Sequence, residues 1–255
     1  MATDGAGRAV VITGASTGIG EACALRLDKE GWRVFVGVRK EADAQRLKQA
    51  ASERLTPLML DVTEQPQIDA AARMVADAVG EAGLRGLVNN AGIGVAGPLE
   101  YLSLEDLRWQ FEVNTFGHIA VTQAFLPLIR KGQGRIVNIV AAYAWTGGPG
   151  TVHSAAAKAG VVALTRTLAV EWAQYGLRVN AVCPGVFHSD GARERLWPEA
   201  EQEEALLRSV PLGRFGKVGE IADAITYLAS PYADYVNGEV LVVDGGAHLG
   251  KGLGG

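Results

Sequence analysis

The sequence is poor in cysteine and carries little excess charge. Only two cysteines occur among 255 residues, so no disulfide framework is expected and the chain suits a reducing compartment. A formal net charge of -4 at pH 7 argues against nucleic acid or an anionic membrane as the main partner. No uncharged apolar run approaches membrane-spanning length, and residues 1–5 lack the basic and apolar regions of a secretory signal. We therefore expect a cytoplasmic protein that acts on a small molecule.

Histidine is also scarce. None of the four histidines has the spacing to carboxylates or thiols that a metal site needs. We therefore expect no metal, and structural roles for His118, His153, His188 and His248.

Near the N-terminus, an apolar run breaks into three spaced glycines and then becomes helical, as in a phosphate-binding strand, turn and helix. Gly14 would permit the tight turn, Gly18 would let backbone N–H groups approach a pyrophosphate, and Gly20 would let the helix pack closely. The anion would lie at the helix N-terminus, where free N–H groups and the helix dipole favour it. The other residues of this turn that we expect at the cofactor are Ser16, Thr17 and Ile19.

Strand-like apolar runs alternate with amphipathic helical patterns from end to end, which is typical of a doubly wound parallel α/β sheet with helices on both faces. We expect one dinucleotide-binding domain over residues 1–255, and a long helix over 104–131 that Pro127 should disturb. A second long helix is expected over 152–175. Segment 186–212 lacks the sheet pattern, which is typical of a substrate lid. The seven expected strands are 9–13, 33–38, 57–61, 86–89, 135–140, 178–183 and 239–243.

The second expected strand ends in Arg39 and Lys40. At this point of such a fold, an acidic residue would accept hydrogen bonds from the ribose 2′-hydroxyl of NAD. Two cations suit a 2′-phosphate instead, so the sequence favours NADPH over NADH. The alternative, that Arg39 and Lys40 only solvate the start of the next helix, stays open.

Four motifs in order give the chain a family resemblance. Thr-Gly-x-x-x-Gly-x-Gly at 13–20 is followed by Asn-Asn-Ala-Gly at 89–92, by Asn114 and by Pro-Gly at 184–185. From about residue 8 to residue 246 the sequence resembles the short-chain dehydrogenase/reductase family. The resemblance implies a Rossmann fold, a nicotinamide cofactor and a homotetramer. It also implies that the cofactor is lined by Asn89, Ala91, Gly92, Pro184 and Gly185.

Further cofactor contacts are implied by the same resemblance. Asp61 and Val62 would lie beside the adenine, with Asp61 accepting from its exocyclic amine, and the Ser189 hydroxyl would bond the nicotinamide carboxamide. A helix N-cap role for Asp61 or Thr63 is an open alternative.

The catalytic pattern departs from that of the commoner family members, which carry Tyr-x-x-x-Lys with a serine thirteen residues before the tyrosine. Lys158 is present here, but Ser154 stands at the tyrosine position and Ala141 at the serine position. An aliphatic hydroxyl is far less acidic than a phenol of pKa about 10, so Ser154 cannot simply replace the tyrosine as proton donor.

Tyr143 lies shortly before the expected long helix, and a tyrosine followed by Ser-x-x-x-Lys resembles the branch of 2,4-dienoyl-CoA and trans-2-enoyl-CoA reductases. The resemblance implies that Tyr143 and Asn114 hold a thioester carbonyl and that Lys158 holds the ribose hydroxyls. Ser154 would orient Lys158 or a water. Alternatively, Tyr143 is a loop aromatic packed beside Trp145, and Ser154 is a serine on the helix surface.

The sequence therefore favours an NADPH-dependent reductase of 2,4-dienoyl- or 2-enoyl-thioesters. Segment 86–114 instead resembles retinoid and steroid carbonyl reductases, which leaves open a carbonyl reductase or alcohol dehydrogenase with Tyr143 as its acid. The missing tyrosine and serine also leave open a non-catalytic protein that binds NADP(H).

Overall fold

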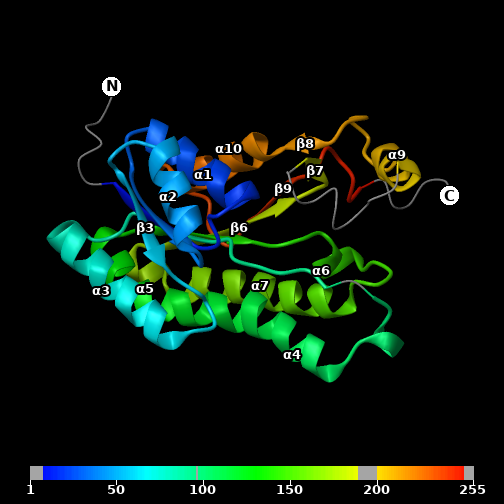
Figure 1. Ribbon diagram of the computed structural model, residues 1–255, viewed down its shortest axis with the longest axis horizontal. Helices are drawn as coiled ribbons and strands as arrows, with labels where there is room; N and C mark the ends of the chain where they lie inside the picture. Colours follow the sequence, from blue (N-terminus) through cyan, green and yellow to red (C-terminus); the bar gives the residue numbers. More distant parts are fainter. Residues whose placement is uncertain (1–7, 96, 189–199, 250–255) are drawn as a thin grey trace.

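The fold is built on a parallel sheet of seven strands, seen in a computed structural model that describes residues 8–95, 97–188 and 200–249 (Figure 1). The strand order is β3-β2-β1-β4-β5-β6-β9, and every neighbouring pair is parallel. The strands are β1 (Ala9–Ile12), β2 (Arg33–Val38), β3 (Leu55–Met59), β4 (Gly86–Asn89), β5 (Arg135–Ile139), β6 (Arg178–Pro184) and β9 (Val240–Val243). A separate pair joins β7 (Phe187–His188) to β8 (Gly216–Lys217). The expected doubly wound fold is confirmed.

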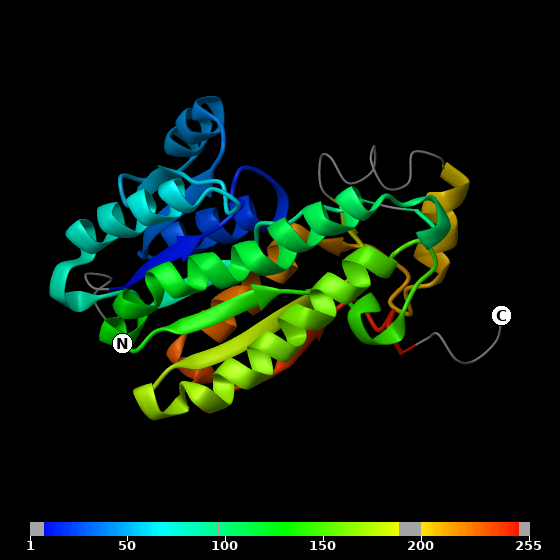
Figure 2. The ribbon, with the colours of Figure 1, turned by 90° about the horizontal axis from the view of Figure 1, so that it is seen from below.

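Helices cover both faces of the sheet. Figure 1 shows α1 (Gly18–Lys29), α2 (Glu41–Ala50) and α10 (Val218–Ala229) on one face. The other face carries α3 (Gln65–Val79), α4 (Leu104–Phe111), α5 (Gly117–Gly132) and α7 (Val152–Glu171), and Figure 2 shows α4, α5 and α7 running along it as green ribbons. Shorter elements are α6 (Tyr143–Thr146), α9 (Ala200–Arg208) and the 3-10 turns Gly80–Ala82, Leu99–Tyr101, Ala173–Tyr175 and Pro231–Ala233.

The core lies on both sides of the sheet, so the strands are apolar at consecutive positions. Val10 and Ile12 pack in the cluster that includes α1 and α10, whereas Val11 packs in the cluster that includes α3 and α5. All three side chains are fully buried. Burial on both faces explains why the sequence shows continuous apolar runs rather than alternation.

The third strand lies two residues earlier than expected, at Leu55–Met59 rather than 57–61. Pro57 therefore lies in the middle of the strand rather than at its start, and it pairs with Val36 in the register of β2 and β3. Proline is tolerated there because β3 is the edge of the sheet, so its missing N–H breaks no ladder on the outer side.

The expected helix over 104–131 is divided, but not at the proline. A π-helical turn, Glu112–Phe116, separates α4 from α5, while Pro127 lies inside α5. The expectation that Pro127 disturbs the helix was wrong. A proline removes only one backbone donor, and α5 is held along its length by buried Val121, Phe125 and Ile129.

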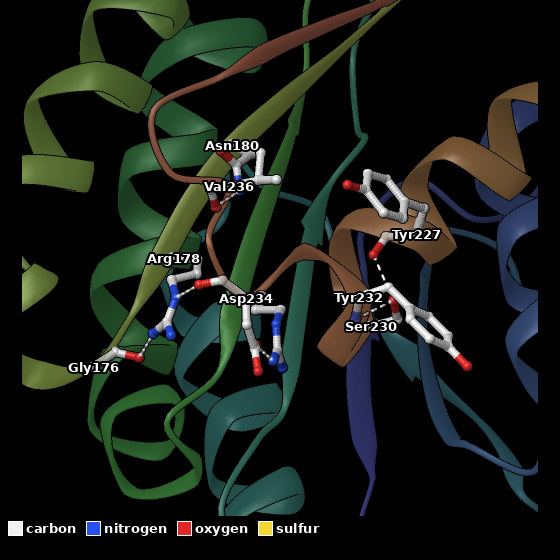
Figure 3. A network of polar contacts seen from close by, with 9 residues as sticks. Gly176, Arg178, Asn180, Tyr227, Ser230, Tyr232, Asp234 and Val236 are labelled. Atoms are coloured by element: carbon white, nitrogen blue, oxygen red, sulfur yellow. Dashed lines mark hydrogen bonds and ion pairs between the residues drawn. The ribbon is translucent and has the colours of Figure 1, made fainter.

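The last strand is tied to its neighbour by polar side chains (Figure 3). Arg178 Nε donates to the Asp234 carbonyl at 2.8 Å, and Asn180 Nδ2 donates to the Val236 carbonyl at 2.9 Å. Both acceptors belong to the connection between α10 and β9, so these bonds hold β9 beside β6.

The cysteines behave as core residues. Cys23 and Cys183 are both buried and free, and burial raises the pKa of each thiol to about 12. No helix in the described part of the chain is long and apolar enough to cross a membrane.

Candidate active site

The glycine turn between β1 and α1 has the geometry of a phosphate cradle. Gly14 and Gly18 have φ of 61° and 62°, a left-handed conformation that favours glycine. A Cβ on Gly14 would lie 2.7 Å from Ala91 Cα, and one on Gly20 would lie 2.5 Å from Asn90 Nδ2. A Cβ on Gly18 would meet no atom of the described residues within 4 Å, so this side of the turn is open. The turn therefore fits a dinucleotide pyrophosphate at the start of α1.

The turn is supported from the segment that follows β4. Asn90 Nδ2 donates to the carbonyls of Thr13 and Gly14 at 3.0 and 2.8 Å. In return, Thr13 Oγ1 accepts from the backbone N–H groups of Asn90 and Ala91. The supporting roles of Thr13 and Asn90 were not expected from the sequence, although both belong to its motifs.

The other expected residues of the turn differ in their exposure and in their contacts. Thr17 is the exposed N-cap residue of α1, whereas Ile19 is buried in the core. The Ser16 carbonyl accepts from Arg46 on α2, and Arg46 Nη1 also contacts Glu21 Oε1 at 2.5 Å. The sequence did not point to Arg46, because its role depends on α2 packing beside the turn.

Asn89 faces the interior. Its Nδ2 donates to Thr122 Oγ1 and Asn138 Oδ1, both at 2.9 Å, and its side chain is fully buried. Only the backbone of Asn89 is thus left to approach a cofactor. Gly92 stands against the other side of the site, where a Cβ would lie 3.0 Å from Asn114 Oδ1.

The end of β2 carries an exposed cation beside a carboxylate. The Arg39 side chain is 67% exposed, and its Nη1 lies 4.0 Å from Asp61 Oδ2. Asp61 Oδ1 accepts from the backbone N–H and the hydroxyl of Thr63, which leaves Oδ2 to face Arg39. Glu64 occupies the N-cap position of α3, so neither Asp61 nor Thr63 is its N-cap. Lys40 is the exposed N-cap residue of α2 and makes no side-chain capping bond.

The remaining expected cofactor residues differ in position. Val62 is buried in the core, and a Cβ on Gly117 would lie 2.7 Å from its Cγ2. Pro184 ends β6, and a Cβ on Gly185 would meet Asp244 Cα at 2.5 Å, so the chain passes closely there. Ser189 lies outside the described residues, as does much of the expected lid over 186–212.

Asn114 lies in the π-helical turn and is fully buried. Its Nδ2 donates to the Ile93 carbonyl and its Oδ1 accepts from the Ile93 N–H, both at 2.8 Å. A π-turn adds a residue to one helical turn and is frequent at functional sites. Here it presents Asn114 to the loop after β4, and among the described residues the second Nδ2 hydrogen has no partner.

Tyr143 and Ser154 meet where α6 faces α7. Tyr143 Oη lies 2.9 Å from Ser154 Oγ, and Gln110 Nε2 lies 3.3 Å from the same serine oxygen. Ser154 is only 5% exposed, so it is not a surface serine. Tyr143 itself is half-buried.

Lys158 follows Ser154 by one helical turn and points into the protein. Its Nζ donates to the Ile139 carbonyl at 2.8 Å, and within the described part of the chain its two other N–H donors have no partner. Burial lowers the pKa of Lys158 to about 8. Nearby His118 bonds the Ala91 carbonyl through Nε2 at 2.8 Å. Burial and then the Lys158 charge lower the pKa of His118 to about 3, so it stays neutral and acts as a donor to Ala91.

Two other histidines also make contacts within the protein: His153 Nε2 contacts the Val95 carbonyl, and His248 Nδ1 lies 2.8 Å from Asp244 Oδ2. Within residues 8–95, 97–188 and 200–249, no group of three or more His, Cys, Asp or Glu side chains could hold a metal ion.

The chain is similar in sequence and structure to known reductases and dehydrogenases. The family described as "Enoyl-(Acyl carrier protein) reductase" matches residues 14–248. The Bacillus subtilis protein named "Probable 2,4-dienoyl-CoA reductase" is 39% identical over 249 residues, which cover 95% of this chain and 97% of that protein. A 3-oxoacyl-acyl-carrier-protein reductase of Thermotoga maritima is 40% identical over 244 residues, which cover 94% of this chain and 97% of that protein. The crystal structure of a short chain dehydrogenase from Bacillus anthracis superposes with a TM-score of 0.85 at 36% identity, covering 94% and 96%.

Proposed function

Because the chain belongs to the short-chain dehydrogenase/reductase family, whose members are oxidoreductases that use NAD(H) or NADP(H), we propose that it is an NADPH-dependent reductase of conjugated 2,4-dienoyl- or 2-enoyl-thioesters. The observation that carries the proposal is the contact of Tyr143 Oη with Ser154 Oγ, one helical turn before Lys158. The contact supports the proposal because it would bring a phenol to the site although Ala141 and Ser154 occupy the usual serine and tyrosine positions.

The residues present fit a nicotinamide dinucleotide. The open turn at Gly18 would take the pyrophosphate at the start of α1, and the two free donors of Lys158 would bind the ribose hydroxyls. Arg39, exposed at the end of β2, would meet the 2′-phosphate. When bound, the reduced nicotinamide supplies a hydride.

The protein side chains would act on the thioester carbonyl. The substrate accepts the hydride and its electron pair at the β-carbon of an enoyl chain, or at the δ-carbon of a dienoyl chain. The electrons of the double bond then move onto the carbonyl oxygen, where hydrogen bonds from Tyr143 and the free Nδ2 hydrogen of Asn114 stabilise the enolate. The α-carbon finally takes a proton from water. An enoyl chain would thereby lose its double bond, a dienoyl chain would keep one double bond between its β- and γ-carbons, and the nicotinamide would be oxidised.

Such a reaction suits this site because the oxygen need only be stabilised, not protonated. A ketone reductase must protonate the developing alkoxide, and there the usual tyrosine and serine matter more. The proposal therefore accounts for the loss of both from their usual positions.

The test is a panel of thioesters with purified protein and NADPH. We expect oxidation of NADPH, together with loss of the conjugated diene, on a medium-chain 2,4-dienoyl-CoA. The Tyr143→Phe variant should lose at least about a hundredfold in kcat, the scale of one removed donor to an oxyanion. Trp145→Phe, an exposed aromatic on the same short helix, is the matched control and should keep activity. No turnover on any conjugated thioester would overturn the proposal.

The cofactor preference has its own test. Replacing Arg39 by alanine removes the cation nearest the proposed 2′-phosphate, and should lower NADPH affinity about tenfold or more while NADH affinity changes little. Arg73→Ala, on α3, is the control for loss of one positive charge. Equal effects on the two cofactors would contradict the NADPH assignment.

A second candidate is a carbonyl reductase. It is favoured by the 40% identity to the Thermotoga maritima 3-oxoacyl reductase and would use Tyr143 as its acid. The same panel separates the two functions, since a 3-oxoacyl thioester would then be the better substrate.

We also propose that the protein is a cytoplasmic homotetramer. Support comes from large apolar side chains left exposed on α4 and α7, namely Leu104, Trp109, Val152 and Val170. Light scattering coupled to gel filtration would test the assembly, and a monomeric mass would contradict it.

A further inference from the structure

Gln110 contacts Ser154 in the candidate active site, but the proposed reaction gives it no part. It lies on α4, one helical turn before Asn114, and its side chain is fully buried. Its Nε2 lies 2.9 Å from the Ile93 carbonyl and 3.3 Å from Ser154 Oγ, while its Oε1 lies 3.3 Å from the Val95 N–H. A buried amide is costly unless its donors and acceptor are paired, and here all three contacts are made.

These contacts determine which way the amide points. The Val95 N–H only donates, so the atom that faces it must be the amide oxygen. The Ile93 carbonyl only accepts, so the atom that faces it must be the amide nitrogen. The reversed amide would set donor against donor and acceptor against acceptor. Gln110 therefore donates to Ser154 Oγ, and the serine oxygen accepts.

The direction of the Ser154 hydroxyl follows from the same bonds. Ser154 is buried, so its own hydrogen needs an acceptor. Among the described residues, the acceptor found within hydrogen-bonding distance is Tyr143 Oη at 2.9 Å. If Tyr143 donated to Ser154 instead, the serine hydrogen would be buried without a partner, which is unfavourable. The two hydroxyls are thus ordered with Ser154 donating to Tyr143.

We propose that Gln110 is a positioning residue that acts through Ser154: by donating to the serine oxygen, it turns the serine hydroxyl toward Tyr143 and leaves the Tyr143 O–H free for the substrate carbonyl. The inference rests on the proposed function only for the identity of that carbonyl. A relay of Gln110, Ser154 and Tyr143 takes the place of the serine that Ala141 replaces. The Tyr143 O–H is then already directed outward before substrate binds.

The experiment is a double-mutant cycle with Gln110→Met, which keeps the length of the side chain and removes its polar atoms, and Ser154→Ala. In the wild-type background, we expect Gln110→Met to lower kcat about tenfold, which corresponds to about 1.4 kcal/mol, with little change in KM. In the Ser154→Ala background the same substitution should change kcat less than about twofold, because the group through which Gln110 acts is gone.

A spectroscopic readout accompanies the kinetics. The carbonyl stretch of an isotope-labelled enoyl-CoA, bound with oxidised cofactor, reports how strongly Tyr143 donates to it. Gln110→Met and Ser154→Ala should each move that band toward its frequency in water, and the double variant should move it no further. Thr115→Val is the matched control, because it removes a different side-chain bond to α7, from Thr115 Oγ1 in the π-helical turn to the Ala157 carbonyl at 3.1 Å.

Three results would overturn the inference: an unchanged kcat in Gln110→Met, an equal loss in both backgrounds, or the same loss in Thr115→Val. If Gln110→Met does not fold, Gln110→Glu serves, since a carboxyl has at most one donor hydrogen, which the Ile93 carbonyl would take, so that none is left to donate to Ser154 Oγ. Wild-type kcat in that variant would refute the proposal. If the wild type reduces only ketones, the proposed function fails, and the same cycle run on the ketone still tests Gln110.

Discussion

Cofactor binding should draw a proton onto Lys158. In the free protein, burial lowers the pKa of this lysine to about 8, so close to half of the molecules carry it uncharged at about pH 8. A bound dinucleotide brings negative phosphates and ribose hydroxyls that favour the ammonium form, which restores a pKa well above 8. Binding and protonation are therefore linked.

The size of the effect follows from the titration curve. Between about pH 7 and about pH 9, the charged fraction of a group with pKa about 8 falls from about nine-tenths to about one-tenth. If the bound lysine stays charged, binding takes up about half a proton at about pH 8 and about a tenth of a proton at about pH 7. NADPH affinity should correspondingly fall as the pH rises through about 8.

Titration calorimetry in two buffers of different ionisation enthalpy measures this uptake. The Lys158→Met variant should show none, whereas Lys131→Met should behave as wild type. Lys131 is the matched control, because it pairs with Glu81 at 2.7 Å on the surface of α5. Proton uptake near zero in the wild type, or equal uptake in Lys158→Met, would show that Lys158 does not gain a proton when the cofactor binds.

Two further substitutions test the scaffold. Gly20→Ala would bring a Cβ within 2.5 Å of Asn90 Nδ2, so we expect a loss of about 1–3 kcal/mol in the free energy of unfolding and weaker NADPH binding, measured by fluorescence. A Cβ on Gly219 would meet no atom of the described residues within 4 Å, so Gly219→Ala should be neutral. Equal effects of the two substitutions would contradict this prediction. Asn89→Leu removes two buried hydrogen bonds and leaves their partners unpaired, so urea denaturation should show a loss of about 2–4 kcal/mol. A stability within about 0.5 kcal/mol of wild type would contradict that role.

The fold was predictable from the sequence because its main signals are local. A buried parallel strand needs continuous apolar residues, as in β1, and the glycine turn needs residues that tolerate positive φ, as at Gly14. Element boundaries depend on neighbours instead. The third strand begins two residues earlier than expected because the edge of a sheet tolerates Pro57 in the middle of a strand, and the edge position of β3 is not visible in the local sequence.

The candidate site was less predictable, because its contacts join segments far apart in the sequence. Tyr143 and Ser154 were singled out by resemblance, but the buried bond between them depends on how α6 meets α7. Gln110 looked like any polar residue of an amphipathic helix. Its proposed role depends on contacts with the loop after β4 and with Ser154 on α7, which the sequence does not reveal.

Whether the protein reduces conjugated thioesters rather than ketones is tested by locating the transferred hydride in a substrate that offers both groups. A 4-oxo-2-enoyl-CoA carries both a conjugated double bond and a ketone, and NADPH deuterated at the transferring position labels whichever is reduced. We predict deuterium on the β-carbon of the thioester with an intact ketone, and labelling at least about a hundredfold slower in Tyr143→Phe. Deuterium on the former ketone carbon would contradict this prediction and identify a carbonyl reductase.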